Sequence, residues 1–286
     1  MKKLALAISI LAVTALNALA ADLPVYTKAP AVVAAAYNWT GFYIGGNAGY
    51  SWGHSNTDLV LDRAARGAVT EIPIGSTSQH IDGALGGFQA GYNKQINSIV
   101  LGVEADIQIT GQKGRSQLSD TILLDNACLA PCNPPPPTPV TGAFDYTRKL
   151  PWFGTLRGRV GVTPTDRSLI YLTGGLAFGE IRSDAMFSVP STAGACIVGV
   201  PCPAPPPTTA SGSFSQNKIG WVLGAGVETV LGGNWTGKLE YLHVDFGSSG
   251  DSFTSGLAFP FFGTFAANSR LTDDIVRVGL NYKLHP

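Results

Sequence analysis

Charged residues are scarce in this sequence. Asp, Glu, Lys and Arg make up 13% of the 286 residues, whereas average soluble domains carry about 25%. The acidic and basic residues balance at 19 each, so the net charge gives no reason to expect nucleic-acid binding. Glycine is abundant, at 35 residues.

Long uncharged apolar runs are also scarce, and the clearest one lies at the start of the chain. Lys2 and Lys3 precede an apolar run at residues 4–16, followed by small residues of the kind that a signal peptidase reads. A signal peptide is expected at residues 1–20. A retained anchor is the alternative, disfavoured because a spanning helix needs about 20 apolar residues. Residues 21–37, rich in Ala and Pro, predict a flexible periplasmic leader.

The remaining apolar residues follow a two-residue period, which is typical of strands. In Gly41–Trp52, Phe42 and Ile44 begin a face that ends in aromatic residues, while the opposite face is polar or glycine. This arrangement suits a sheet whose outer face meets lipid. The same pattern predicts seven further strands, near residues 83–93, 99–109, 152–162, 169–179, 218–228, 235–246 and 276–284.

One predicted strand breaks its own pattern. Leu242, Val244 and Phe246 fall on the polar side of the strand at 235–246. A β-bulge or a buried apolar layer inside the barrel would each explain this change, and the sequence leaves both open.

The connections between the strands alternate in length. Short turns are expected at 93–98, 163–167 and 230–234, and long segments at 53–79, 111–144, 182–213 and 247–270. The prediction is an all-β fold, an eight-stranded antiparallel up-and-down transmembrane β-barrel over residues 38–286, with four long external loops and both termini periplasmic. A soluble lipocalin-like barrel would instead point its apolar face inward.

Charges share the predicted inner face with glycines. An eight-stranded barrel has room inside only for side chains, so opposite charges there must pair. A salt-bridged plug is therefore favoured over a conducting pore. The predicted interior charge network consists of Glu104, Asp106, Arg157, Arg159, Lys218, Glu228, Lys238, Glu240, Arg277 and Lys283.

Aromatic residues flank the predicted membrane-facing segments, as expected of interfacial girdles. Asn38–Gly41 and Asn234–Gly237 repeat the same four residues, and each is expected to place its Trp at the interface. The predicted girdle residues are Trp39, Phe42, Trp52, Tyr92, Trp152, Trp235 and Tyr282.

Two predicted external loops each carry a pair of cysteines near a proline run. The pairs are Cys128 with Cys132 and Cys196 with Cys202. An oxidising compartment favours two local disulfides, although crossed pairings and a metal site are alternatives. A third loop carries an apolar patch, Phe259, Phe261, Phe262 and Phe265, which is either exposed for contacts or folded against the barrel or the membrane.

Two further patterns have weaker functional interpretations. Ser51 lies in a G-x-S-x-G motif near His54 and Asp58, but the hydrolase chemistry needs a strand-turn-helix that this segment does not predict. His54 and His80 stand at the two ends of the first long loop, so a hairpin would bring them together. Solvated loop-base histidines are favoured there over a haem or metal contact. No resident metal or cofactor is predicted.

The strand motifs resemble those of small alphaproteobacterial outer-membrane β-barrel proteins, often labelled porin-family or opacity-like. The matching stretches are residues 37–46, 239–247 and 277–283. The resemblance covers nearly the whole mature chain and implies an eight-stranded membrane barrel without an enzyme site. One departure is the ending Leu284-His285-Pro286, where such proteins usually carry an aromatic residue that the barrel-assembly machinery reads.

The sequence therefore predicts a non-enzymatic outer-membrane barrel with a structural role in the envelope and loops displayed at the surface. A narrow channel for small solutes is one alternative. A surface receptor or adhesin, including a haem-binding one, is another. The expected partners are outer-membrane lipid, lipopolysaccharide and the barrel-assembly machinery, with a host or surface partner for the loops as a further option.

Overall fold

The computed structural model describes residues 37–65, 68–124, 138–189, 208–254 and 264–284. The predicted signal peptide and all but the last residue of the predicted leader lie outside the described residues. The described residues contain no helix with the length and apolarity needed to cross a membrane.

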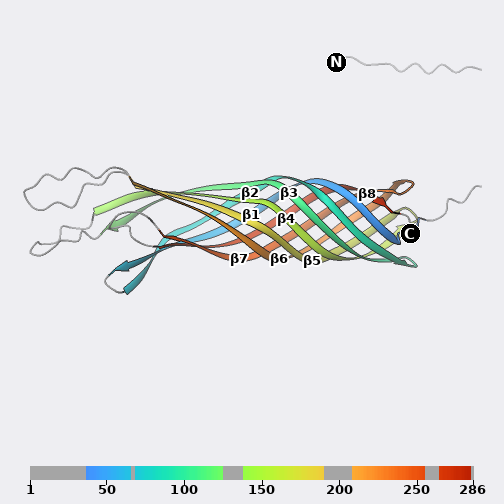
Figure 1. The fold of residues 1–286 in the computed structure, drawn as a ribbon, viewed down its shortest axis with the longest axis horizontal. Helices are drawn as coiled ribbons and strands as arrows, with labels where there is room; N and C mark the ends of the chain where they lie inside the picture. The colour runs from blue at the N-terminus through green and yellow to red at the C-terminus, as the bar shows by residue number, and fades with distance from the viewer. Residues whose placement is uncertain (1–36, 66–67, 125–137, 190–207, 255–263, 285–286) are drawn as a thin grey trace, which may run out of the picture. The chain divides into compact units, whose positions relative to one another are not determined.

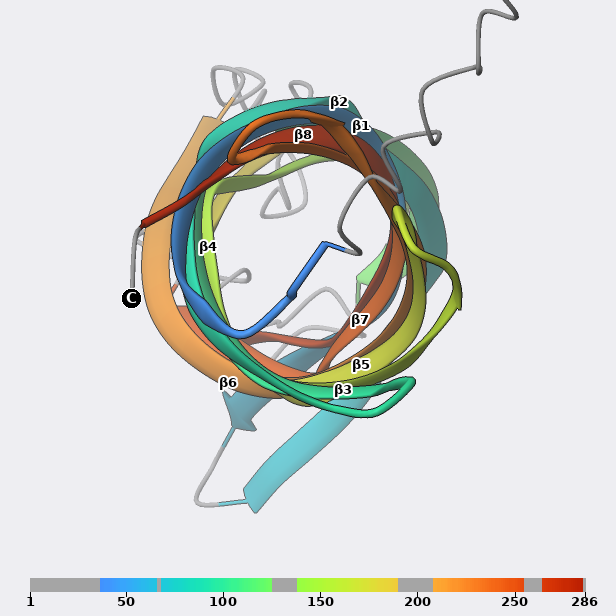
Figure 2. The same cartoon turned by 90° about the vertical axis from the view of Figure 1, so that its right-hand side faces the viewer.

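Eight strands form one closed antiparallel sheet (Figures 1 and 2). Each strand pairs with the next in sequence, and β8 pairs with β1 to close the ring. The strands are β1 (Gly41–Ala65), β2 (Ala68–Ile96), β3 (Ile99–Leu124), β4 (Thr138–Thr165), β5 (Ser168–Val189), β6 (Thr208–Gly232), β7 (Trp235–Thr254) and β8 (Thr264–Lys283). The predicted eight-stranded up-and-down barrel is confirmed.

The three predicted short turns lie at one end of the barrel, called here the turn end. They join β2 to β3, β4 to β5 and β6 to β7. Asn97 and Gly233 occupy two of these turns with φ near +53°. Gly233 adopts this left-handed conformation without steric cost, and Asn is among the few other residues that tolerate it.

The strands are much longer than the roughly ten residues expected from the sequence pattern. They contain 20 to 29 residues, and β1 and β2 occupy nearly all of the segment 53–79 that was expected to be a loop. The apolar-outward alternation ends where contact with lipid ends, but the hydrogen-bonded ladder continues into water. The alternating pattern therefore predicts only the lipid-facing part of each strand and not the full length of the strand.

The outer surface of the barrel's middle is apolar. Phe88, Ile109 and Ile219 expose 74–76% of their surface, as expected of side chains that point into lipid rather than into a core. The inner face carries glycines where large side chains cross the lumen. A Cβ on Gly91 would lie 2.3 Å from the Tyr43 hydroxyl and 2.6 Å from the Val103 carbonyl oxygen.

The interior contains an apolar layer that the sequence reading did not assign. Leu242 and Val244 are 0% exposed and Phe246 is 2% exposed, which settles the unusual pattern of β7 in favour of a buried layer. A register shift lies between Asp245 and Ser248, at Phe246 itself, so it does not account for Leu242 and Val244. The apolar layer consists of Ile81, Leu85, Leu150, Phe153, Ala177, Ile181, Val222, Leu242, Val244, Phe246, Leu271 and Ile275.

Candidate functional site

The inner face between the apolar layer and the turn end carries a cluster of buried charges, called here the charge network. Its members are at most 7% exposed and come from five strands. The four cations and four carboxylates are Arg157, Arg159, Lys238, Arg277, Glu104, Asp106, Glu228 and Glu240. Strand register places opposite charges side by side, with Glu104 beside Arg157 and Glu240 beside Arg277.

Two guanidinium groups and two carboxylates form the centre of the charge network. Arg157 donates to Asp106 at 2.9 Å and to Glu240 at 3.0 Å. Arg277 lies 3.0 Å from the same Asp106 oxygen and 2.6 Å from the other Glu240 oxygen. Each cation therefore bridges both carboxylates, the multiple charge-assisted contacts that buried ion pairs need.

The other half of the network is also paired. Lys238 donates to Glu104 at 2.9 Å, and Arg159 donates to Glu228 at 3.1 Å. The guanidinium of Arg159 stacks on the Tyr43 ring at 4.9 Å, and the Tyr43 hydroxyl donates to Glu104 at 2.7 Å. Aromatic rings thus cover the flat faces of the cation while its edges bind carboxylate.

Sequence reasoning missed the neutral residues that complete the charge network. Tyr171 covers the second face of Arg159 at 5.1 Å and donates to Glu240. Asn281 donates to Glu228 at 2.9 Å and accepts from Gln89 at 2.7 Å. All of these side chains face inward, as the predicted charged residues do. Their inward parity was the signal in the sequence that could have identified them.

Two of the predicted network residues lie elsewhere. Lys218 stands ten residues before Glu228 on β6, about 33 Å along the strand, and no ion pair reaches it from the described residues. Lys283 lies at the turn end, where it donates to the backbone oxygen of Asn38 and stacks on Tyr37. Both have the inward parity of the charge network but stand too far along their strands to join it.

Comparison with known proteins identifies the family. The model of the outer membrane protein β-barrel domain matches residues 6–283. The chain belongs to this family. It is 35% identical over 291 residues to the 31 kDa outer-membrane immunogenic protein of Brucella melitensis biotype 1, covering 99% of this chain and 100% of that protein.

A more distant relative is the 22 kDa outer membrane protein of Rhizobium leguminosarum bv. viciae, 26% identical over 79% of this chain and 73% of that protein. Among solved structures, the outer membrane protein OprG of Pseudomonas aeruginosa is similar with a TM-score of 0.47 and 11% identity, covering 87% of this chain and 98% of that chain. The family match and the Brucella and Rhizobium relatives show that the protein is an outer-membrane barrel, and its turn end faces the periplasm.

Six of the seven predicted girdle residues face outward from this outer-membrane barrel. Phe42 contacts Tyr92 at 4.7 Å and Trp235 contacts Tyr282 at 5.0 Å, both near the turn end. The other girdle contains Trp52 and Trp152 and, unforeseen from the sequence, Tyr50, Phe178, Trp221 and Tyr241.

Trp39 is not a girdle residue. Its side chain is 3% exposed and packs with Val100, Leu169 and Tyr171 inside the turn end. In the first of the two repeated tetrapeptides the strand begins only at Gly41, whose φ is +139°, so Trp39 precedes the strand. In the second repeat, β7 begins at Trp235 itself and the ring is 50% exposed.

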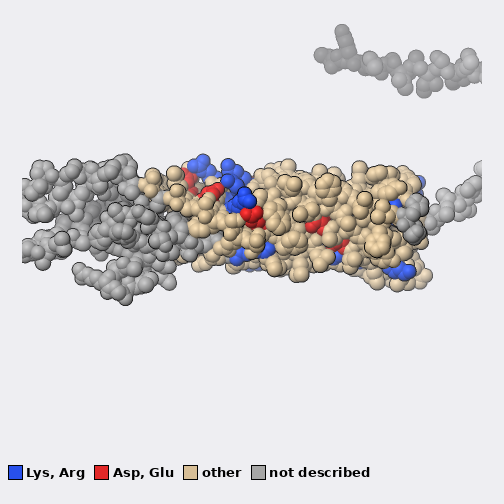
Figure 3. All heavy atoms as spheres, in the orientation of Figure 1, with Lys and Arg blue, Asp and Glu red and all other residues tan. Residues whose placement is uncertain are grey.

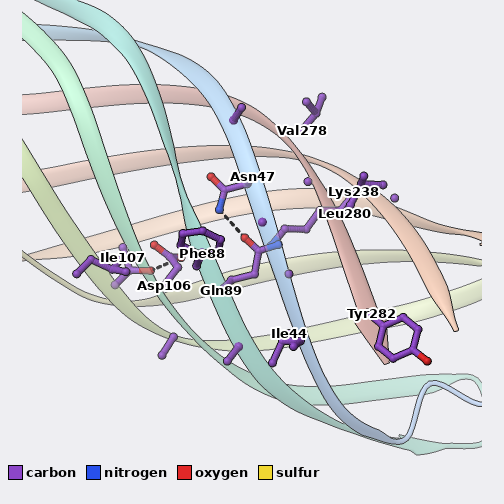
Figure 4. A pocket seen from close by; sticks show the side chains of 18 of the residues that line it. Ile44, Asn47, Phe88, Gln89, Asp106, Ile107, Lys238, Val278, Leu280 and Tyr282 are labelled. Carbon is purple, nitrogen blue, oxygen red and sulfur yellow. Dashed lines mark hydrogen bonds between the residues drawn. The ribbon is translucent and has the colours of Figure 1, made fainter. Parts of the chain in front are cut away.

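The apolar outer wall also bounds a broad, open hollow. Ile44, Val278 and Leu280 line it from outside, and Asn47 and Gln89 lie behind them, joined by a hydrogen bond between β1 and β2 (Figure 4). Its lining is mostly apolar, which suits contact with acyl chains of the bilayer.

The hydrolase interpretation of Ser51 is wrong. Ser51 is fully buried and accepts a hydrogen bond from Gln112 inside the barrel, whereas His54 and Asp58 are exposed on the outward face of the same strand. His54 and His80 do meet, as expected, with ring centroids 4.5 Å apart. The described residues contain no group of three or more His, Cys, Asp or Glu placed to hold a metal ion.

The remaining predicted sites cannot be placed. Cys128, Cys132, Cys196, Cys202, Phe259, Phe261 and Phe262 lie outside the described residues. Phe265 lies in β8. The local disulfides and the exposed apolar patch therefore stay predictions.

Proposed function

We propose that this outer-membrane protein is a closed, non-enzymatic structural barrel of the cell envelope. The observation that supports the proposal is the charge network, in which four buried cations and four buried carboxylates contact one another across the lumen. An eight-stranded barrel has an interior that side chains fill, and here the largest of them hold one another in place.

The charge network opposes ion passage electrostatically. A permeating ion would have to separate Arg157 or Arg277 from Asp106 and Glu240. Such a separation leaves a buried charge without a partner, which costs about 3–5 kcal/mol where it has been measured by mutation. The cost would be met at several pairs in succession, because the pairs span the lumen.

The apolar layer forms a second barrier above the charge network. Leu150, Val222, Leu242 and Val244 are all 0% exposed. At the same level Gln112 donates to Ser51 and Asp273, so side chains fill this part of the lumen. Hydrophobic constrictions stop conduction by excluding water. A narrow solute channel, the main alternative, would have to open both barriers.

Planar-bilayer recording tests the proposal. Purified monomer is expected to give no stable conductance steps. A channel-forming outer-membrane porin reconstituted in parallel serves as the positive control, and a heat-dependent shift of gel mobility shows that the protein is folded. Large, long-lived steps from the monomer would contradict the closed barrel.

The strand extensions favour a second role, display of the connecting segments at the cell surface. The strands of 20–29 residues exceed the 9–11 residues that cross the membrane, so their far ends stand beyond the bilayer surface. A Brucella relative is named an outer-membrane immunogenic protein, which agrees with display.

Antibodies raised against residues 190–207 test this display role. They are expected to label intact cells, while antibodies against the turn at 163–167 label only permeabilised cells. The reverse pattern would exclude outward display. Binding assays with variants that lack one connection would then separate a receptor or adhesin role from a purely structural one.

A further inference from the structure

Three cations stand side by side on the outer surface of three neighbouring strands. Strand register pairs Lys113 of β3 with Lys149 of β4, and Lys149 with Arg182 of β5. All three alternate with inward-facing neighbours and therefore point away from the lumen. We call them the cationic row. Like charges directly opposite each other destabilise a sheet, so this arrangement favours binding of an anion.

The cationic row begins where the lipid-facing surface ends. Trp152 of the girdle precedes it toward the membrane, with Ile109 and Glu180 as register partners. The Trp152 indole donates to Glu180 at 3.0 Å, the orientation of a girdle ring whose polar edge meets the aqueous side. Figure 3 shows Lys and Arg, with Asp and Glu among them, gathered beyond the mostly uncharged middle of the barrel, away from its turn end. The row thus stands at the level of the outer-leaflet headgroups.

The carboxylates near the cationic row are held by the neighbouring strand. Lys149 contacts Asp184 at 3.0 Å and Arg182 contacts Glu180 at 2.8 Å. Hydrogen bonds from Ser213 on β6 and from Lys149 hold the pKa of Asp184 below its usual value, and Ser215 likewise donates to Glu180. Both carboxylates therefore remain ionised, and each is shared between a cation of the row and a serine of β6.

On the β3 side of the row, Lys113 has no ion-pair partner among the described residues. The register partner of Lys113 on β2 is Asp82, but the two do not come within ion-pair distance, and no other carboxylate of the described residues does so either. The next cation outward, Arg115, is already paired with Asp145 at 3.1 Å. Lys113 is thus the cation of the row that forms no ion pair with the described residues.

We propose that Lys113, Lys149 and Arg182 bind a phosphate group carried by an anionic glycolipid of the outer leaflet. A phosphomonoester supplies up to two negative charges and several acceptor oxygens, which match two ammonium groups as point charges and one guanidinium as a planar donor. Surface pairs such as Lys149 with Asp184 are weak, so they do not prevent the cations from turning toward a dianion. The proposal requires the outer-membrane location and is independent of whether the barrel conducts.

A lipid-binding assay with the full-length protein in phosphate-free nanodiscs tests the proposal. The probe is a fluorescent lipid A-type glycolipid with two phosphates, compared with its dephosphorylated form and with inorganic phosphate as a competitor. The variant is Lys113→Gln with Lys149→Gln and Arg182→Gln. The matched control is Lys94→Gln, an exposed lysine of β2 near the turn end.

The triple variant is expected to bind the phosphorylated probe about tenfold or more weakly, since each surface cation contributes to anionic-lipid binding, while Lys94→Gln leaves binding unchanged. The single variant Lys113→Gln, which breaks no ion pair with the described residues, is expected to weaken binding about threefold and guards against misfolding of the triple variant. Equal binding by the triple variant, or equal binding of the dephosphorylated probe, would overturn the proposal. Inorganic phosphate competing as well as the glycolipid would assign the site to free phosphate instead.

Discussion

At the residue scale, the function of a buried charge depends on how many partners share it. Arg157 bridges Glu104, Asp106 and Glu240, so no single carboxylate is its exclusive counterion. The four cations match the four carboxylates of the charge network, and Tyr and amide side chains occupy further hydrogen-bonding positions. A substitution here is therefore expected to disturb several pairs at once.

Arg157→Ala is expected to destabilise the barrel by about 3–5 kcal/mol, because it leaves buried carboxylates without their shared partner. The temperature at which the folded form disappears from detergent gels, together with urea unfolding in micelles, measures the loss. The control is Arg115→Ala, which removes an exposed ion pair worth about 1 kcal/mol or less. Equal stability losses in the two variants would show that the network does not stabilise the fold.

The two tryptophans of the repeated tetrapeptide provide a spectroscopic prediction. In variants that keep only one tryptophan, fluorescence of Trp235 is expected to be quenched by brominated lipids, because its ring is 50% exposed on the outer surface. Fluorescence of Trp39, which is 3% exposed inside the turn end, is expected to be little affected. Similar quenching of both would place Trp39 at the lipid interface, as the sequence alone suggested.

At the element scale, β7 shows why one face of a strand can change character along its length. Lys238 and Glu240 belong to the charge network, whereas Leu242 and Val244 on the same face belong to the apolar layer. The sequence showed that the alternation changed at this point. Whether the strand bulged or the lumen became apolar depended on inward-facing residues of β2, β4, β5, β6 and β8, and sequence spacing along one strand does not report them.

Leu242→Ala is expected to lower the free energy of unfolding by about 2–5 kcal/mol, the usual effect of leaving a cavity in a packed apolar core. Leu239→Ala on the same strand is the matched control, because Leu239 is 49% exposed on the lipid-facing side. Urea titration of both variants in the same micelles measures the difference. A smaller effect at Leu242 than at Leu239 would exclude a packed layer.

At the scale of the whole molecule, much of the fold could be predicted because contact with lipid leaves a regular pattern. Strand number, the three short turns and eight of the ten proposed network residues follow from parity and the spacing of turn residues. Strand length, the apolar layer and the burial of Trp39 could not be predicted from the sequence. They depend on contacts between strands, or on the point where a strand begins.

Two barriers lie in series along the barrel, the charge network and the apolar layer, so removing part of one is expected to leave the barrel closed. In planar bilayers Leu242→Ala alone is predicted to remain silent because the charge network still fills the lumen. Leu242→Ala combined with Arg157→Ala and Arg277→Ala is predicted to give measurable conductance, provided the variant stays folded in detergent gels. Conductance from the single variant would show that the network does not obstruct ions.

The position of Arg277 on the last strand has a consequence for how the molecule is made. Asp106 and Glu240 each receive one guanidinium from β4 and the other from β8, and β8 completes the ring by pairing with β1. Until that final seam joins, the two acids are only half neutralised. The pairing of β8 with β1 therefore also completes the pairing of the buried charges during biogenesis. In an unfinished barrel Asp106 and Glu240 still lack part of their counterions.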